Sequence, residues 1–378
     1  MFFIPSFRKL KLSRVIAHAV LSVMALGLIP ITAIAEEKPK IQIAILLDSS
    51  NSMDGLIDQT RQQIWNVVNA LTAVRKAGQV PELEIALYHY GNDALPQSEG
   101  FNRQLTDFTP ELDAVSERLF EIRTNGGQEY AGWVIQSAID QLQWSPDSED
   151  FRAIFIAGNE PFDQGKVAWQ DSISLAKRSD VLVNTIYCGQ SESQERDLWA
   201  QGAELADSAT FNINQDRAIA FVPSPFDDEI TRLNQALNDT YIPFGVEGTL
   251  GLQRQLVQDA NAGQQIVTRG ASKSSSYYNN ASWDLIDALA EESVDLAEVE
   301  DDQLPETLRG LSLEEKETFI DDQKAEREAI QAQIRDLTAQ RQAYLEDLRR
   351  QSDPQDTLDY VMIQALRQQL AAKGFVLR

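Results

Sequence analysis

IQIAILLDSSNS, residues 41–52, is the stretch that decides the fold: an almost wholly apolar run that ends in small polar residues. An apolar run of this length, bounded by turn-forming residues, is typical of a strand that is buried on both faces. Strands that alternate with helices predict an α/β fold, a doubly wound and mostly parallel sheet with helices on both of its faces. The expected strands are 41–47, 83–90, 153–157, 181–188 and 210–213, and the expected helices between them are 56–76, 112–122 and 134–142.

The polar end of this stretch places a carboxylate and two hydroxyls at alternating positions, Asp48, Ser50 and Ser52. In a tight loop at a strand end, these three side chains can point at one centre. A ligand set of few carboxylates and several neutral oxygens suits a hard divalent cation, Mg²⁺ first, with Mn²⁺ or Ca²⁺ as alternatives. The same residue types also favour a plain turn that caps the following helix. The buried strand before the loop and the long amphipathic helix after it favour the metal site.

The Asp48-x-Ser50-x-Ser52 pattern after a buried strand resembles the metal-ion-dependent adhesion site of the von Willebrand factor type A (VWA) domain. The resemblance covers about 41–225. Further segments are similar to a bacterial exported subgroup of that family. These segments are TNGGQEYAGWVI at 124–135, AGNEPFDQG at 157–165, VNTIYCG at 183–189, TYIPFG at 240–245 and NASWDLIDAL at 280–289. The resemblance implies a binding module that contacts a protein partner through a bound cation.

The family's site draws on three loops, and this chain matches only the first of them in full. The second loop normally supplies a Thr within a Gly-rich turn, where this chain has Glu129 three residues before Gly132. The third loop normally supplies an Asp, and alignment within one residue offers Asn159 or Glu160 instead. The resemblance therefore implies a modified metal site made of Asp48, Ser50, Ser52, Glu129, Asn159 and Glu160.

Glu129 in place of a Thr changes the expected chemistry of the site. A second carboxylate raises the affinity for a hard cation and lowers the attraction of that cation for an outside carboxylate. Glu129 is also able to occupy the position that a partner's acidic side chain takes in the standard site. The alternative is that Glu129 only caps the helix that begins near Ala131, where a negative charge is favoured.

The composition limits the class of protein. The 378 residues include 33 Lys+Arg and 58 Asp+Glu, a net charge of −25. Such acidity argues against nucleic-acid binding, which needs basic patches, and fits a protein that binds cations or basic partners. One Cys, Cys188, excludes an intrachain disulfide, and two His exclude a multi-His zinc site.

The N-terminus carries the features of an export signal. Four bases, Arg8, Lys9, Lys11 and Arg14, precede an almost wholly apolar stretch at 15–34. Ala33-Ile34-Ala35 matches the small-x-small pattern, so we expect cleavage after Ala35 and a periplasmic or secreted protein without stable membrane insertion. An uncleaved membrane anchor is the alternative, because the apolar run is nearly long enough to span a bilayer.

Beyond the sheet domain the pattern becomes helical. Residues 241–251 carry three Gly and a Pro, which favours a loop, and 291–302 hold seven acids and no base, which is typical of a solvated linker. A long segment without Gly or Pro carries a heptad-like seam of Ile330, Ile334, Leu337, Arg341, Tyr344 and Leu348. We expect this seam to self-associate, giving a homo-oligomer, or to pack against the helices of 226–290. Expected helices here are 227–237, 252–262, 283–291, 313–350 and 358–372.

The sequence thus divides into an export signal at 1–35, a VWA domain at 36–225, a helical extension and acidic linker at 226–302, and a coiled-coil tail at 303–378. The favoured function is an exported, metal-dependent binding protein with a protein partner that the sequence does not name. One alternative is a structural or assembly factor that acts through the tail. The other is a metal-dependent hydrolase with Glu129 or Glu160 as base. We assign no catalytic residue and expect no enzyme, because the sequence carries no convincing catalytic constellation.

Overall fold

The structure is a computed structural model, and it describes residues 38–214, 221–349 and 358–377. The expected export signal at 1–35 lies outside these residues. Within the described ranges, no helix combines the length and the apolar character that crossing a bilayer requires.

Six strands of the described chain form one sheet, in the order β4-β3-β1-β5-β6-β7. All neighbouring strands are parallel except β4, which runs antiparallel to β3 at one edge. The doubly wound, mostly parallel sheet that the sequence predicts is therefore confirmed. The strands are β1 Lys40–Asp48, β3 Glu82–Tyr90, β4 Asn102–Thr109, β5 Phe151–Gly158, β6 Leu182–Tyr187 and β7 Thr210–Asn212.

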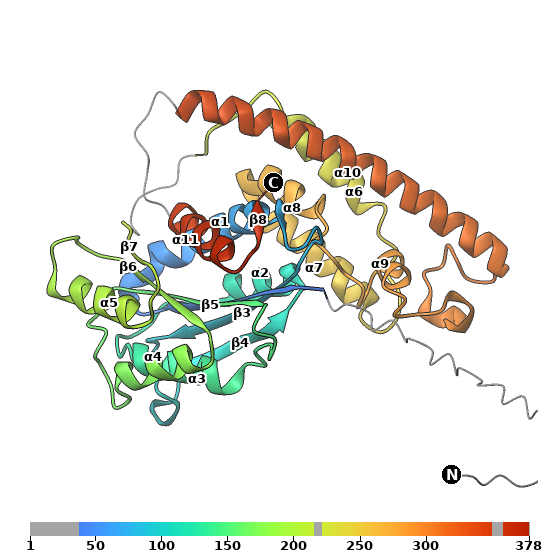
Figure 1. The fold of residues 1–378 in the computed structure, drawn as a ribbon. Coiled ribbons are helices and arrows are strands. Elements are labelled where there is room, and N and C mark those ends of the chain that lie inside the picture. The colour runs from blue at the N-terminus through green and yellow to red at the C-terminus, as the bar shows by residue number, and fades with distance from the viewer. Residues whose placement is uncertain (1–37, 215–220, 350–357, 378) are drawn as a thin grey trace, which may run out of the picture. The chain divides into compact units, whose positions relative to one another are not determined.

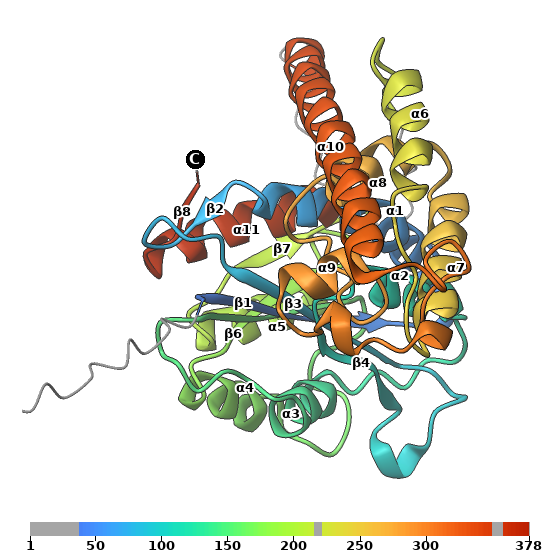
Figure 2. The same cartoon turned by 90° about the vertical axis from the view of Figure 1, so that its right-hand side faces the viewer.

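Helices cover both faces of the sheet, and the alternation of side chains along β1 shows why. Ile43 and Ile45 belong to one buried cluster, whereas Ala44 and Leu46 belong to the other, because successive residues of a strand face opposite sides. Figures 1 and 2 show the two helical layers. The first layer contains α1 Asp54–Leu71, α2 Leu112–Glu121 and α11 Leu358–Ala372, and the second contains α3 Ala131–Gln141, α4 Trp169–Arg178 and α5 Gln194–Leu205.

The last helix of the chain belongs to the sheet domain. Leu366 and Leu370 of α11 are buried in the same cluster as β1 and α1, and Figure 1 shows α11 beside α1. Gly374 has φ of 78° just after the helix, which confirms the stop signal expected there. The chain then pairs as β8 Val376–Leu377 with β2 Val74–Arg75 in a two-stranded antiparallel ladder.

A helical part lies between β7 and α11 in the sequence. Its long helix α10 buries Ile330 and Ile334 against Leu233 and Leu237 of α6, so the first half of the heptad seam packs within the chain. The end of the seam stays more open, with Tyr344 38% exposed. The helices are α6 Asp227–Asn238, α7 Gly248–Asn261, α8 Ile266–Lys273, α9 Leu285–Ala290 and α10 Leu313–Arg349.

Buried ion pairs join this helical part to α2 of the sheet domain. Arg269 in α8 is fully buried and donates from Nη2 to Asp113 Oδ2 at 3.1 Å. Its guanidinium also lies 4.8 Å from the centroid of the Trp65 ring in α1. Removing either partner of such a pair leaves an uncompensated buried charge, so the contact is costly to break.

Some expected boundaries are wrong. The helix expected at 56–76 ends at Leu71, because Val74 and Arg75 pair with the C-terminus as β2. The loop expected at 241–251 gives way to α7 at Gly248, and a Cβ on Gly251 would lie 2.2 Å from the Trp283 ring. The acidic linker at 291–302 contains two short 3-10 helices. The sequence analysis names no range for several observed elements: β2, β4, β8, α4, α5, α8, η1 Asn51–Met53, η2 Gln97–Glu99, η3 Gly263–Gln265, η4 Leu296–Glu298 and η5 Asp301–Gln303.

Candidate metal centre

The candidate site lies at the carboxyl edge of the sheet, where three neighbouring strands end. Asp48 is the last residue of β1, Tyr90 the last of β3 and Gly158 the last of β5. Parallel strands bring these ends to one edge, which is where doubly wound sheets bind ligands. The register places Asp48 directly opposite Tyr90, so the loops that follow the two strands begin side by side.

The first loop turns its polar side chains together. Asp48 is fully buried, and its Oδ1 accepts a hydrogen bond of 2.8 Å from the backbone N–H of Ser50. The hydroxyls of Ser50 and Ser52 lie 3.2 Å apart. Two backbone hydrogen bonds join this loop to the second, from Asn51 N–H to Gly126 O and from Asn125 N–H to Ser49 O, both 3.0 Å long. The structure therefore brings all three first-loop residues of the expected site together.

Glu129 of the second loop joins them. Both Asp48 and Ser50 act on the pKa of its carboxyl group, and only 3% of the residue is exposed. The N-cap residue of α3, Tyr130, makes no side-chain capping hydrogen bond, and Glu129 immediately precedes it. Its backbone N–H donates to Gln164 Oε1 at 3.3 Å.

Two buried carboxyl oxygens of the site have no hydrogen-bond donor among the described residues: Asp48 Oδ2 and Glu129 Oε2. Burial raises the pKa of both carboxyl groups, and the neighbouring Asp48 raises the pKa of Glu129 further. Two adjacent carboxylates in a buried site cannot both carry their charge without a compensating cation. The pair therefore holds a proton, or it requires a positive ion in the proton's place.

The third loop places its two candidates differently. Asn159 Nδ2 donates to Ser52 Oγ at 3.1 Å, so its amide lies beside the first loop. Glu160 Oε2 accepts a 3.3 Å hydrogen bond from Gln164 Nε2, and its backbone carbonyl accepts one of 2.8 Å from Trp199 Nε1. Glu160 still acts on the site through its charge, which raises the pKa of both Asp48 and Glu129.

Two glycines that the sequence analysis did not single out leave room for the carboxyl groups. A Cβ on Gly91 would lie 2.8 Å from Asp48 Oδ1 and 2.7 Å from Glu129 Cγ. A Cβ on Gly158 would lie 3.1 Å from Asp48 Oδ2 and 2.5 Å from Tyr90 Oη. The signal for both was their position at the carboxyl end of a strand of the parallel sheet, where a Gly lets other groups approach the backbone closely.

A buried polar contact joins Ser49 of the first loop to His89 of β3. Ser49 Oγ lies 3.0 Å from His89 Nδ1 and donates to the Tyr90 carbonyl at the same distance. Burial, with the nearby Arg103 charge, lowers the pKa of His89 to about 4, so the ring is neutral at pH 7. Cys188 is buried at the end of β6. Both residues are therefore packed in the interior.

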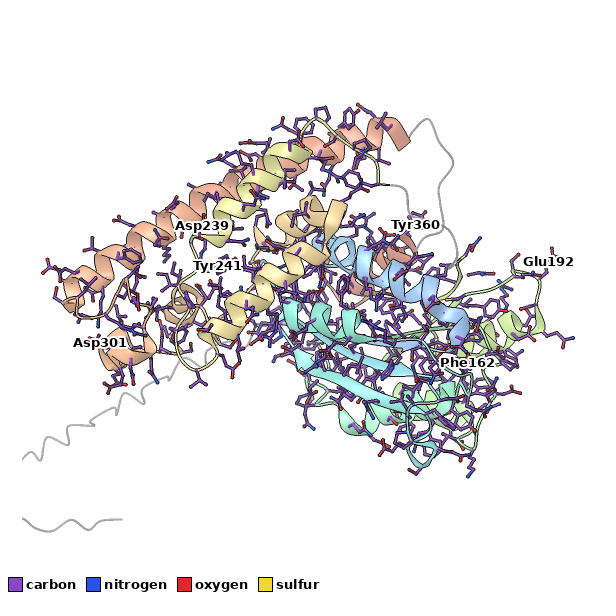
Figure 3. All side chains as sticks on the ribbon, turned by 180° about the vertical axis from the view of Figure 1, so that it is seen from behind. Phe162, Glu192, Asp239, Tyr241, Asp301 and Tyr360 are labelled. Atoms are coloured by element: carbon purple, nitrogen blue, oxygen red, sulfur yellow. The ribbon has the colours of Figure 1, made fainter. Side chains whose placement is uncertain are left out.

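An aromatic cluster fixes the third loop. Phe162, labelled in Figure 3, packs edge-on against Trp199 with ring centroids 4.8 Å apart, and against Trp169 at 5.8 Å. Together with the hydrogen bond from Trp199 to the carbonyl of Glu160, these contacts hold the residues after β5 in place. A rigid support of this kind keeps the polar side chains of a site pre-organised.

The residues fit a hard divalent cation by their chemistry. Asp48, Glu129 and the hydroxyls of Ser50 and Ser52 are oxygen donors, and two of the carboxyl oxygens lack any other partner. No three His, Cys, Asp or Glu side chains gather around one point anywhere in the described chain. A cation here would therefore depend on the two carboxyl groups of Asp48 and Glu129, completed by neutral oxygens.

No protein-family model matches the sequence, and no curated protein matches it. Three solved structures show a likeness to part of the chain. Proximal thread matrix protein 1 from the mussel byssus, with a zinc-occupied MIDAS motif, is 13% identical with a TM-score of 0.36, over 48% of this chain and 43% of that one. The SpRpn10 VWA domain is 17% identical with a TM-score of 0.33, over 51% and 95% of the two chains.

The third likeness is to the pilus adhesin SpaC from Lactobacillus rhamnosus GG, 11% identical with a TM-score of 0.36, over 61% of this chain and 30% of that one. The chain thus spans less than half of the mussel protein and of the adhesin. The fold assignment rests on the strand order and on the polar loop after β1 in the chain itself.

Proposed function

We propose that this chain, whose sheet and loops form a von Willebrand factor type A domain, is an exported binding protein that uses a divalent cation to contact a protein partner. The observation that carries the proposal is the pair of buried carboxyl oxygens, Asp48 Oδ2 and Glu129 Oε2, that lack a donor. Mg²⁺ is the first candidate for the cation, and Mn²⁺ and Ca²⁺ are the others.

Each residue of the candidate metal centre has a separate role in holding a cation. Asp48 is held by the Ser50 N–H at one oxygen and offers the other, while the Ser50 and Ser52 hydroxyls supply neutral donors. Glu129 brings the second negative charge from the next loop, and Asn159 fixes Ser52 from the third. A bound divalent cation would supply an electrophilic centre at the sheet edge, to which an acidic side chain of a partner is attracted.

The second carboxyl group changes two properties of the site: its affinity for the cation, and the attraction of the bound cation for a partner's carboxylate. Two carboxylates neutralise the charge of a divalent cation, so its attraction for a partner's carboxylate falls. We therefore expect the cation to act chiefly by ordering the three loops, with the loop surface supplying most of the partner contacts. This expectation distinguishes the proposed site from one with Thr in the second loop.

The two alternative functions have less support. The coiled-coil function needs a free apolar seam on α10, but Ile330 and Ile334 already pack against α6, which leaves Tyr344 and Leu348 as its exposed residues. The hydrolase function needs a group that activates water. Its expected bases are Glu129 and Glu160, but Glu129 is buried and Glu160 Oε2 accepts a hydrogen bond from Gln164.

Calorimetric titration of Mg²⁺, Mn²⁺ and Ca²⁺ into the protein tests the metal part of the proposal, with Glu204→Gln on the exposed side of α5 as the control variant. We expect saturable binding of at least one cation to the wild type and to the control, and none to Asp48→Ala. Affinity capture of partners with and without chelator tests the interaction part. Equal capture in both conditions would overturn the role of the cation while leaving a metal-independent binding module.

A further inference from the structure

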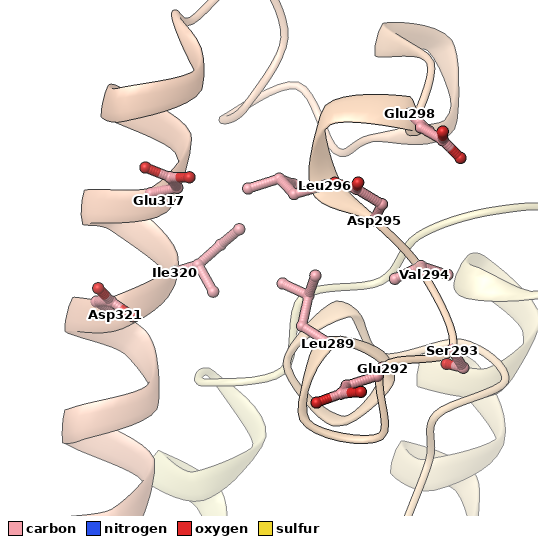
Figure 4. Close-up of a pocket in the computed structure, with 10 residues that line it drawn as sticks. All are labelled: Leu289, Glu292, Ser293, Val294, Asp295, Leu296, Glu298, Glu317, Ile320 and Asp321. Carbon is pink, nitrogen blue, oxygen red and sulfur yellow. The ribbon is translucent and has the colours of Figure 1, made fainter. Parts of the chain in front are cut away.

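A second candidate binding surface lies far along the chain from the metal centre, between the start of α10 and the segment that follows α9. It is a hollow of about 820 Å³, shown in Figure 4. Four of the residues that line it are apolar, and we refer to them together as its floor: Leu289, Val294, Leu296 and Ile320. Leu296 and Ile320 are buried in one hydrophobic cluster, so packing holds both side chains in fixed positions. We refer to this hollow as the acidic groove.

All the charged residues on the rim of the acidic groove are acidic, and the remaining polar residue there is Ser293. Five carboxyl groups line it, and no Lys, Arg or His stands among the lining residues that the structure describes. Within the described chain none of the five makes an ion pair, although other acids nearby do, such as Asp301 with Lys316. Unpaired like charges around an apolar floor create a strongly negative potential inside the hollow. The five are Glu292, Asp295, Glu298, Glu317 and Asp321.

We propose that the acidic groove binds a short basic segment of a partner protein, with an apolar side chain on the floor and flanking Lys or Arg side chains on the rim. The charge of the groove requires a cationic ligand, and the apolar floor requires one with apolar surface next to its charges. A basic peptide segment with an apolar anchor satisfies both requirements. The groove also has the volume that sites for drug-sized ligands have, about 300–1,000 Å³.

A metal ion does not fit the same surface. A hard cation needs six to eight oxygens within about 2.6 Å, whereas these carboxyl groups are spread around a wide hollow. In the described residues no three acidic side chains are grouped as metal ligands. A polyamine matches the charge but leaves the apolar floor without a partner. The acidic groove is also independent of the metal centre, so failure of either proposal leaves the other standing.

The net charge of −25 attracts any basic peptide, so the test needs variants matched in charge. The groove variant is Glu317→Gln with Asp321→Asn, and the control is Asp322→Asn with Glu326→Gln, which removes the same charge from another face of α10. A third variant, Ser293→Trp, fills the groove without changing the charge, at an exposed position. Circular dichroism verifies that all three variants stay folded.

The probe is a fluorescein-labelled peptide of two leucines flanked on each side by three lysines, measured by fluorescence anisotropy at physiological salt. We expect the groove variant and Ser293→Trp to weaken binding about tenfold, and the control by less than about twofold. A peptide with serines in place of the leucines, and spermine, should both bind more weakly than the probe. Equal losses in the groove variant and the control, or no loss with Ser293→Trp, would overturn the proposal.

Discussion

Asn184 in β6 and Gln369 in α11 exchange two side-chain hydrogen bonds although 185 residues separate them: Asn184 Nδ2 donates to Gln369 Oε1 at 3.1 Å, and Gln369 Nε2 donates to Asn184 Oδ1 at 2.6 Å. Asn184 is fully buried, so this amide pair satisfies polar groups in the interior of the sheet domain. The helix that closes the chain is therefore a part of the layer that covers the sheet, and the helical part at 226–349 is inserted ahead of it.

This contact predicts the effect of Gln369→Leu. The variant leaves the buried Asn184 Nδ2 without its acceptor, which costs about 1–3 kcal/mol of unfolding free energy. Gln368→Leu, at an exposed position of the same helix, is the control and should change stability by less than about 0.5 kcal/mol. Urea unfolding of the three proteins measures the difference. Equal stability of Gln369→Leu and the wild type would show that α11 is not anchored through this pair.

The metal centre predicts the loss of cation-dependent stabilisation in Asp48→Ala. A cation present at 100 times its dissociation constant adds about 2.7 kcal/mol to the folded state of the wild type. The variant lacks the carboxyl oxygen that is free to bind the cation, so its melting temperature should not change when Mg²⁺ or Mn²⁺ is added. Thermal melts with and without each cation measure this. An unchanged shift in the variant would place the cation elsewhere.

If Glu129 is a metal ligand, two substitutions at this position should change the cation affinity of the protein. Glu129→Thr and Glu129→Gln both remove a negative charge from the site, so both should bind Mg²⁺ and Mn²⁺ more weakly, because hard cations gain most from carboxylates. Glu129→Thr should also bind an outside carboxylate, such as a glutamate-containing peptide, better than the wild type does. If Glu129 acts only as a helix cap, each change costs at most about 1 kcal/mol of stability and leaves cation affinity unchanged. Calorimetric titration decides between these outcomes.

The lowered pKa of His89 predicts that the folded protein loses stability in mild acid. Burial, and then the charge of Arg103, lower its pKa in the folded protein to about 4 from the ordinary value of 6.5. Between pH 6.5 and 4 the unfolded chain binds the proton and the folded chain does not, so this contribution is present above pH 6.5 and is lost as the pH falls through 4. The full loss is about 3 kcal/mol.

The variant His89→Asn isolates this contribution, because it keeps a polar group beside Ser49 and does not titrate in this range. We expect the difference in unfolding free energy between the wild type and the variant to change with pH only between about 6.5 and 4. Denaturant unfolding at a series of pH values measures it, and the carboxyl groups common to both proteins cancel in the difference. A difference that does not depend on pH would contradict the buried, neutral state of the ring.

The sequence by itself determined the sheet and the first loop of the site. The pattern of buried strands and amphipathic helices is a local signal, and it placed β1, β3, β5 and β6 to within a few residues. The metal loop could be predicted for the same reason, because Asp48, Ser50 and Ser52 are neighbours in sequence and share one turn. The edge strand β4 was missed, since half-exposed strands carry a weaker apolar pattern.

The tertiary structure alone decided what depends on contacts between distant residues. It placed Glu129 beside Asp48, set Asn159 against Ser52, and used Gly91 to make room for both carboxyl groups. It also placed α11 on the sheet and set part of the largely exposed acidic stretch at 291–302 opposite α10, as one wall of a groove. Local sequence encodes secondary-structure propensity and the period of the hydrophobic pattern. These contacts instead join residues that lie dozens to hundreds of positions apart, so they form only when the whole chain packs.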